Sequence, residues 1–87
     1  MAQGGRRVEF FGLSTCGWCR RTKAWLDDNG INYELCYVDM VQGDELKAAK
    51  ERMKQFVTKE SFPILIINNG EKVIQGYHLE DFEEALG

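Results

Sequence analysis

The chain has 87 residues, of which 44% are hydrophobic and 29% charged, and its net charge is −3 at neutral pH. This length fits one domain with a modest core. The negative net charge gives no sign of the basic surface that nucleic-acid binding requires. Three cysteines are an odd and small number for a disulfide-stapled secreted scaffold, and no apolar stretch is long enough to span a membrane. We therefore expect a cytoplasmic protein with neither nucleic-acid nor membrane partners.

Residues 1–7 are predicted to be a flexible leader, and residues 8–87 to be the folded domain. The leader carries Arg6-Arg7 but no apolar segment. A twin-arginine export signal needs a hydrophobic segment after the arginines, whereas residues 8–13 run directly into a cysteine motif. The sequence therefore argues against export by that route.

The first predicted element is a short buried strand over residues 8–13, which leads into a Cys-Gly-Trp-Cys motif at residues 16–19. A helix is expected from Trp18 to Asn29-Gly30, where glycine supplies the left-handed C-cap. The residues with helical spacing on its apolar face are Trp18, Thr22, Trp25 and Leu26.

This context places Cys16 just ahead of the helix and Cys19 inside its first turn. The free backbone N–H groups and the positive dipole end at a helix start favour a thiolate over a thiol. A thiolate is the attacking species in thiol–disulfide exchange, and a second thiol one turn away can attack the resulting mixed disulfide. The motif therefore indicates redox chemistry.

A Cys-X-X-Cys pair can also form half of a structural zinc site. Zinc takes four ligands, usually from two such pairs or from one pair and two histidines. Beyond the motif the chain offers only Cys36 and His78, which are far apart in sequence. We therefore favour redox chemistry over metal binding.

Residues 31–39 alternate as in a second strand, with Cys36 and Val38 on one face, so Cys36 is expected to be a small buried hydrophobe. A long helix follows, and Asp44 is expected to cap it. The apolar stripe of this helix consists of Leu46, Ala49, Met53, Phe56 and Val57.

After Pro63, the apolar run of residues 64–67 predicts a buried central strand. Asn68-Asn69-Gly70 is a strong hairpin signal, with residues 72–74 as the partner strand. His78 is expected to cap a last helix, whose inward-facing residues are Leu79, Phe82, Ala85 and Leu86. This order of elements predicts an α/β fold with a four-stranded mixed sheet and helices on both faces.

After the leader, the whole chain resembles a glutaredoxin, a member of the thioredoxin-like superfamily. Three features carry the resemblance. They are the Cys-Gly-Trp-Cys motif, Ser61-Phe62-Pro63 before the third strand, and Gly76-Tyr77 before the last helix. The resemblance implies the β-α-β-α-β-β-α glutaredoxin fold and a glutaredoxin-type thiol–disulfide oxidoreductase, with Cys16 and Cys19 as catalytic residues.

The resemblance also implies how a substrate is held. In that family the proline after the long helix is cis and faces the cysteine pair, and the residue before it holds the substrate chain like an added strand. Pro63 would be the cis-proline here, and the backbone of Phe62 would pair with the substrate. The other residues placed at the substrate or glutathione are Thr15, Trp18, Arg20, Ser61, Gly76 and Tyr77.

Two departures from the family pattern concern glutathione. Glutaredoxins usually carry Lys or Arg three residues before the first cysteine, where this chain has Leu13. They also carry a Gly-Gly pair followed by an aspartate at the last helix, whereas Gly76 is a lone glycine with no acid at the matching turn. We therefore expect weakened glutathione recognition, with Arg20 and Arg21 either compensating or forming a solvated face. The Gly-aromatic turn is similar to glutaredoxin-like proteins that take electrons from thioredoxin reductase and reduce ribonucleotide reductase.

The expected reaction follows from the two sulfurs. Cys16 attacks a substrate disulfide, and Cys19 resolves the mixed disulfide. The expected partners are disulfide-containing or glutathionylated proteins, with glutathione or thioredoxin reductase as electron donor, and the protein is expected to act as a monomer without a resident cofactor or metal. An alternative is an iron–sulfur cluster carrier. Glutaredoxins with glycine at the position of Gly17 can hold a [2Fe–2S] cluster in a dimer through the first cysteine and two glutathiones, and the weakened glutathione anchors argue against this.

Overall fold

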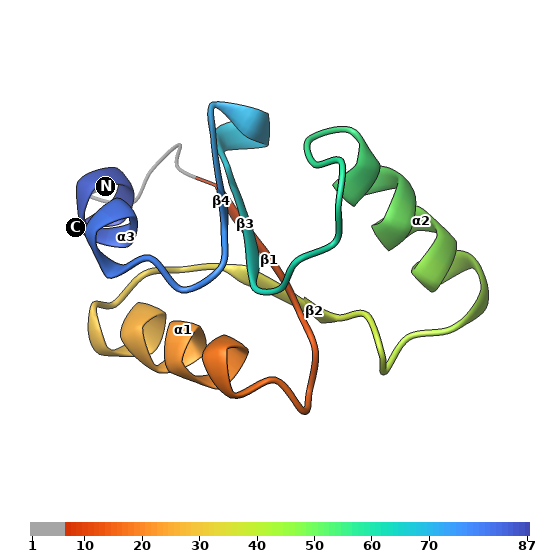
Figure 1. Cartoon of the computed structure of the whole chain (residues 1–87), viewed down its shortest axis with the longest axis horizontal. Helices are drawn as coiled ribbons and strands as arrows, with labels where there is room; N and C mark the ends of the chain where they lie inside the picture. Colours follow the sequence, from red (N-terminus) through yellow and green to blue (C-terminus); the bar gives the residue numbers. More distant parts are fainter. Residues whose placement is uncertain (1–6) are drawn as a thin grey trace.

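The computed structural model describes residues 7–87, in which a mixed β-sheet lies between helices on both of its faces (Figure 1). The leader expected over residues 1–7 lies outside the described residues except for Arg7. The predicted order of strands and helices, and the thioredoxin-like glutaredoxin fold, are confirmed.

The sheet has four strands in the order β2-β1-β3-β4. The central strands are β1 (Val8–Gly12) and β3 (Ile64–Ile67), whose residues are all buried. β1 runs parallel to β2 (Glu34–Tyr37) and antiparallel to β3, and β3 pairs antiparallel with β4 (Lys72–Gln75). The turn at Asn68–Gly70 connects β3 to β4 and confirms the predicted hairpin.

Side chains that alternate along the central strands divide the core into two layers. On one face, Phe10 of β1 packs in one cluster with Leu26 of α1 (Gly17–Asp28) and Phe82 of α3 (Leu79–Leu86). On the other face, Phe11 packs with Met53 of α2 (Gly43–Lys54). Burying each large apolar side chain stabilises the fold by about 1.5–3 kcal/mol. Both layers thus fix β1, whose carboxyl end leads into the cysteine motif.

Two ion pairs hold the sheet at the end opposite this motif. The guanidinium of Arg52 donates to both carboxylate oxygens of Glu9, at 2.7 and 3.0 Å, and the Glu9 residue is only 7% exposed. Arg7 Nε donates to a carboxylate oxygen of Glu34 at 2.9 Å. The Arg52 pair therefore satisfies a carboxylate that the sheet buries.

Several local predictions were wrong at element boundaries. The cap of α2 is Gln42, not Asp44, because Gly43 begins the helix with a positive φ of 61°, and Gln42 makes no side-chain cap bond. Asp44 instead lies in the first turn, where its negative charge suits the helix dipole. The second strand is shorter than residues 31–39, because the amide of Ile31 bonds the carbonyl of Leu26 at 2.9 Å and ends α1.

The last helix also differs from the prediction. Leu79 is 40% exposed, because it is the first residue of α3 and lies a turn before Phe82, which begins the buried stripe. His78 occupies the N-cap position as expected, but its side chain makes no cap bond. The two residues therefore remain accessible beside the cysteine motif.

Candidate active site

Cys16 is the N-cap residue of α1 and is half-buried. Its Sγ accepts a hydrogen bond from the backbone amide of Cys19 at 3.2 Å. The sulfur thus makes the N-cap hydrogen bond that a side-chain oxygen of Ser, Thr, Asp or Asn usually makes. The Cys16 amide bonds the carbonyl of Leu13 at 3.1 Å and closes the turn before the helix. The Cys19 amide of the first turn therefore points at the Cys16 sulfur, which lies at the N-terminal end of α1.

Cys19 lies in the first turn of α1, and its side chain is fully buried. Burial, with a smaller contribution from the hydrogen bond to Cys16, raises the pKa of Cys19 to about 12. Gly12 makes room for this sulfur, because a Cβ at position 12 would lie 3.2 Å from the Sγ atom. Cys19 is therefore a buried, protonated thiol in the first turn of α1, where the sequence placed it; the burial itself was not predicted.

The segment before β3 contributes a second part of the site. The Phe62–Pro63 peptide bond is cis, which confirms the expectation for Pro63. The Pro63 carbonyl accepts a hydrogen bond from the Gly76 amide at 2.8 Å, so the turns before β3 and after β4 are joined. Ser61 is exposed, while Phe62 is half-buried and contacts both layers of the core.

A groove of about 250 Å³ lies beside these turns, and its lining residues are Trp18, Phe62, Gly76, Tyr77 and His78. Trp18, the residue between the two cysteines, is 54% exposed. The rings of Trp18 and Tyr77 are tilted by 31° to each other with centroids 5.4 Å apart, and the Arg21 guanidinium lies 5.0 Å from the centroid of the Trp18 ring. The groove therefore has aromatic walls and one cationic rim.

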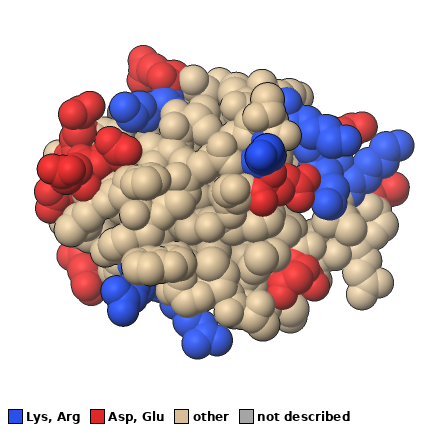
Figure 2. All heavy atoms as spheres, in the orientation of Figure 1, with Lys and Arg blue, Asp and Glu red and all other residues tan. Residues whose placement is uncertain are grey.

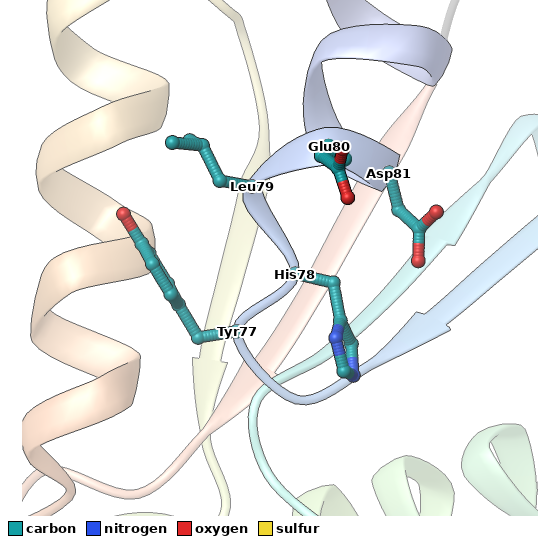
Figure 3. A pocket seen from close by; sticks show the side chains of 5 residues that line it. All are labelled: Tyr77, His78, Leu79, Glu80 and Asp81. Atoms are coloured by element: carbon teal, nitrogen blue, oxygen red, sulfur yellow. The ribbon is translucent and has the colours of Figure 1, made fainter.

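A larger hollow of about 390 Å³ continues along the start of α3 (Figure 3). The side chains of Tyr77 and Leu79 point toward α1, whereas His78 and Asp81 point away from it. Glu80 and Asp81 are exposed, so this hollow is acidic where the first groove is apolar. The smaller groove is the one that joins the two sequence features, because Trp18 of the cysteine motif and Phe62 before the cis-proline both line it.

Figure 2 shows the charges around this region: acidic side chains gather over α3, basic ones over α1, and an uncharged expanse lies between them. Four predicted contact residues do not line the groove: Thr15, Arg20 and Ser61 are exposed, and Pro63 is buried. Arg21 is the arginine that contacts a groove residue. Helical spacing could have indicated this choice, because residues 18 and 21 lie three apart on one face.

Two observations concern metal ligands and the position of Leu13. Among residues 7–87 no cluster of three or more His, Cys, Asp or Glu side chains could hold a metal ion. Leu13, at the position where the family resemblance implies a cation, packs against the apolar cluster around Phe11. Leu13 therefore offers no positive charge to a glutathione carboxylate. Cys36, which was expected to be buried, is half-buried and packs on the same cluster as a small apolar residue. Partial burial and, as a smaller cause, repulsion from Glu45 raise the pKa of Cys36.

The fold and the free Cys16/Cys19 pair define a thioredoxin-like dithiol protein. Residues 8–73 match the family model named Glutaredoxin. The chain is 42% identical to a glutaredoxin from Methanosarcina mazei Go1, with a TM-score of 0.84 over 93% of this chain and 78% of that one. The chain therefore belongs to the glutaredoxin family.

Two further solved structures are similar. Methanoredoxin from Methanosarcina acetivorans is 38% identical, with a TM-score of 0.86 over 93% of this chain and 84% of that one. The glutaredoxin-like protein NrdH-redoxin from Escherichia coli is 23% identical, with a TM-score of 0.70 over 93% of this chain and 95% of that one. The latter likeness shows a shared fold alone. Among the described residues, no helix is long and apolar enough to cross a membrane.

Proposed function

We propose that this protein is a thiol–disulfide oxidoreductase that reduces disulfides of protein substrates through Cys16 and Cys19. One observation carries the proposal: Cys16 is only half-buried and its sulfur accepts a hydrogen bond from a helix-start amide, while the Cys19 thiol one turn away is fully buried. A more accessible nucleophile with a protected resolving thiol suits two-step exchange.

The reaction proceeds in two balanced steps. The Cys16 thiolate attacks one sulfur of the substrate disulfide, a mixed disulfide forms, and the other substrate sulfur leaves as a thiolate. Cys19 then attacks the Cys16 sulfur and gives up its proton to the departing substrate sulfur, which forms the Cys16–Cys19 disulfide and releases the second substrate thiol. Two electrons pass from the protein to the substrate, and an external reductant restores the dithiol.

The groove supports a peptide substrate. Phe62, before the cis-proline, lines the groove together with Trp18 of the cysteine motif and Tyr77, whose rings offer apolar walls for a side chain next to the substrate cysteine. Aromatic stacking of this kind contributes about 0.5–1.5 kcal/mol per pair beyond burial. Both cysteines belong to one chain, so the reaction needs no second copy, and a reducing cytoplasm would keep them as thiols.

Glutathione is expected to be a poor electron donor. Leu13 supplies no cation to a glutathione carboxylate, and the hollow at the start of α3 presents Glu80 and Asp81 instead. A thioredoxin reductase, which transfers electrons from its own dithiol, requires neither anchor. We therefore propose a reductase of that class as the donor.

Disulfide-reduction assays with both donor systems test this function. The wild-type protein should reduce a protein disulfide with thioredoxin reductase and NADPH, and more slowly with glutathione and its reductase. Cys16→Ser should abolish turnover, and Cys19→Ser should accumulate a mixed disulfide on Cys16. Full activity of Cys16→Ser would refute the assignment of the nucleophile, while Cys36→Ser serves as the matched control and should keep wild-type turnover.

A further inference from the structure

The turn that carries the nucleophile is bonded to a carboxylate from a distant part of the chain. The Ser14 backbone amide donates to Asp39 Oδ1 at 3.0 Å, and the Ser14 hydroxyl donates to Asp39 Oδ2 at 2.5 Å. Ser14 lies two residues before Cys16, whereas Asp39 lies 25 residues later, after β2. One carboxylate thus satisfies both donors of a single residue in the active-site turn.

The sheet brings Asp39 to this position. The parallel register places Tyr37 opposite Gly12, and the Val38 amide continues the ladder by donating to the Gly12 carbonyl at 3.0 Å. Asp39 is the next residue, and the Met40 amide bonds the Tyr37 carbonyl at 2.9 Å, which turns the chain away from the sheet. The carboxylate is therefore fixed by backbone pairing before it reaches Ser14.

The anchored turn in turn fixes the nucleophile. The Cys16 amide bonds the Leu13 carbonyl at 3.1 Å, so residues 13–16 form a closed turn with Ser14 inside it. Rotation of this turn would move the Cys16 sulfur away from the Cys19 amide, which donates a hydrogen bond to it at 3.2 Å. Asp39 holds the turn from the side of the sheet, and its carboxylate is the acceptor for both Ser14 donors.

We propose that Asp39 is a positioning residue for the dithiol: through Ser14 it holds the 13–16 turn so that the Cys16 sulfur stays in line with Cys19 and with the groove. This inference rests on the proposed oxidoreductase function. Asp39 would support that function through Ser14, without contacting the substrate itself.

The charge of Asp39 has a second effect, which can be separated from anchoring. The hydrogen bonds from the Ser14 hydroxyl and amide hold the pKa of Asp39 below its usual range, so the group is anionic at neutral pH. The ionisable groups that act on the Cys19 thiol are Cys16 at the N-cap and Asp39 beyond β2, and each raises the Cys19 pKa in addition to burial. Asparagine keeps an acceptor for the amide and can donate to the Ser14 hydroxyl, but it carries no charge.

The test compares Asp39→Ala, Asp39→Asn and Ser14→Ala with the wild type. The matched control is Asp44→Ala, which removes an exposed carboxylate of the first turn of α2. Asp39→Ala should lower both kcat/KM for a small disulfide and the alkylation rate of Cys16 by on the order of three- to ten-fold, because the turn loses both bonds. Ser14→Ala keeps the backbone bond and should give a smaller loss. Asp39→Asn should recover most of the rate and shift the onset of Cys19 alkylation to lower pH.

Two results would overturn the inference. One is a folded Asp39→Ala protein whose two rates stay within two-fold of the wild type. The other is an Asp39→Asn protein that loses as much rate as Asp39→Ala, with an unchanged pH profile, which indicates a general structural role. The alkylation readout needs no substrate, so an inactive wild type would refute the proposed function while the positioning of Cys16 is still tested.

Discussion

Cys19 should resist alkylation in the folded, reduced protein. Burial, with the hydrogen bond to Cys16, raises the pKa of Cys19 to about 12, against 9.0 for an unperturbed cysteine thiol. Below pH 8.5 this difference of about three units lowers the thiolate fraction by about three orders of magnitude. A more basic thiolate is the better nucleophile, with a Brønsted slope near 0.45, so the net rate falls by about 40-fold. The complete burial of the side chain slows the reagent further.

The assay is timed alkylation of the reduced protein with iodoacetamide between about pH 6 and pH 10, followed by mass spectrometry of the peptides. Cys16 should be modified first at every pH, because its sulfur is the accessible one. The reference rate for Cys19 comes from the same protein unfolded in denaturant, where burial and the Cys16 contact are lost. If folded Cys19 reacts within about three-fold of its unfolded rate, the account of a protected resolving thiol is wrong.

Three further predictions follow from the site and the fold. Leu13→Lys should raise glutathione-coupled turnover by roughly ten-fold through one charge-assisted contact, whereas Leu13→Met should leave it unchanged, and equal rates for both variants would contradict the missing-anchor argument. Arg52→Ala should lower stability by about 2–3 kcal/mol, because it leaves the buried Glu9 carboxylate with only the more distant Arg7, at 3.7 Å. Thermal unfolding should show this as a fall of roughly 10–20 °C in Tm, with the Cys16 alkylation rate of the folded protein unchanged. Anaerobic reconstitution with iron, sulfide and glutathione should give no visible absorption band of a [2Fe–2S] cluster, and a stable band would support the carrier alternative.

The order of elements was predictable because the signals are local. Alternation along the strands, the glycine after Asn29 and the Asn68–Gly70 turn each act within a few residues, and the structure confirms each of them. The redox role of the cysteine motif was also predictable, because it depends on the spacing of the two cysteines and on their place at the start of α1. The cis bond before Pro63 was predicted from the family resemblance.

The features that the sequence did not predict depend on long-range register. The Ser14–Asp39 contact joins residues 25 positions apart, and only the pairing of β1 with β2 brings them together. The exposure of Leu79 depends on where α3 begins relative to the sheet, and hydrophobic spacing alone placed this side chain inside. Periodicity indicates a face of a helix, but it does not indicate which turn of that face the neighbouring elements cover.

A single-turnover experiment tests the central claim most directly. The fully reduced protein is mixed with an equimolar protein disulfide, the reaction is stopped with acid, and both proteins are analysed by mass spectrometry with peptide mapping. The account predicts that the protein loses two hydrogens and gains one intramolecular disulfide between Cys16 and Cys19, while the substrate gains two thiols. A disulfide that involves Cys36, or a substrate that remains oxidised while the dithiol stays reduced, would contradict it.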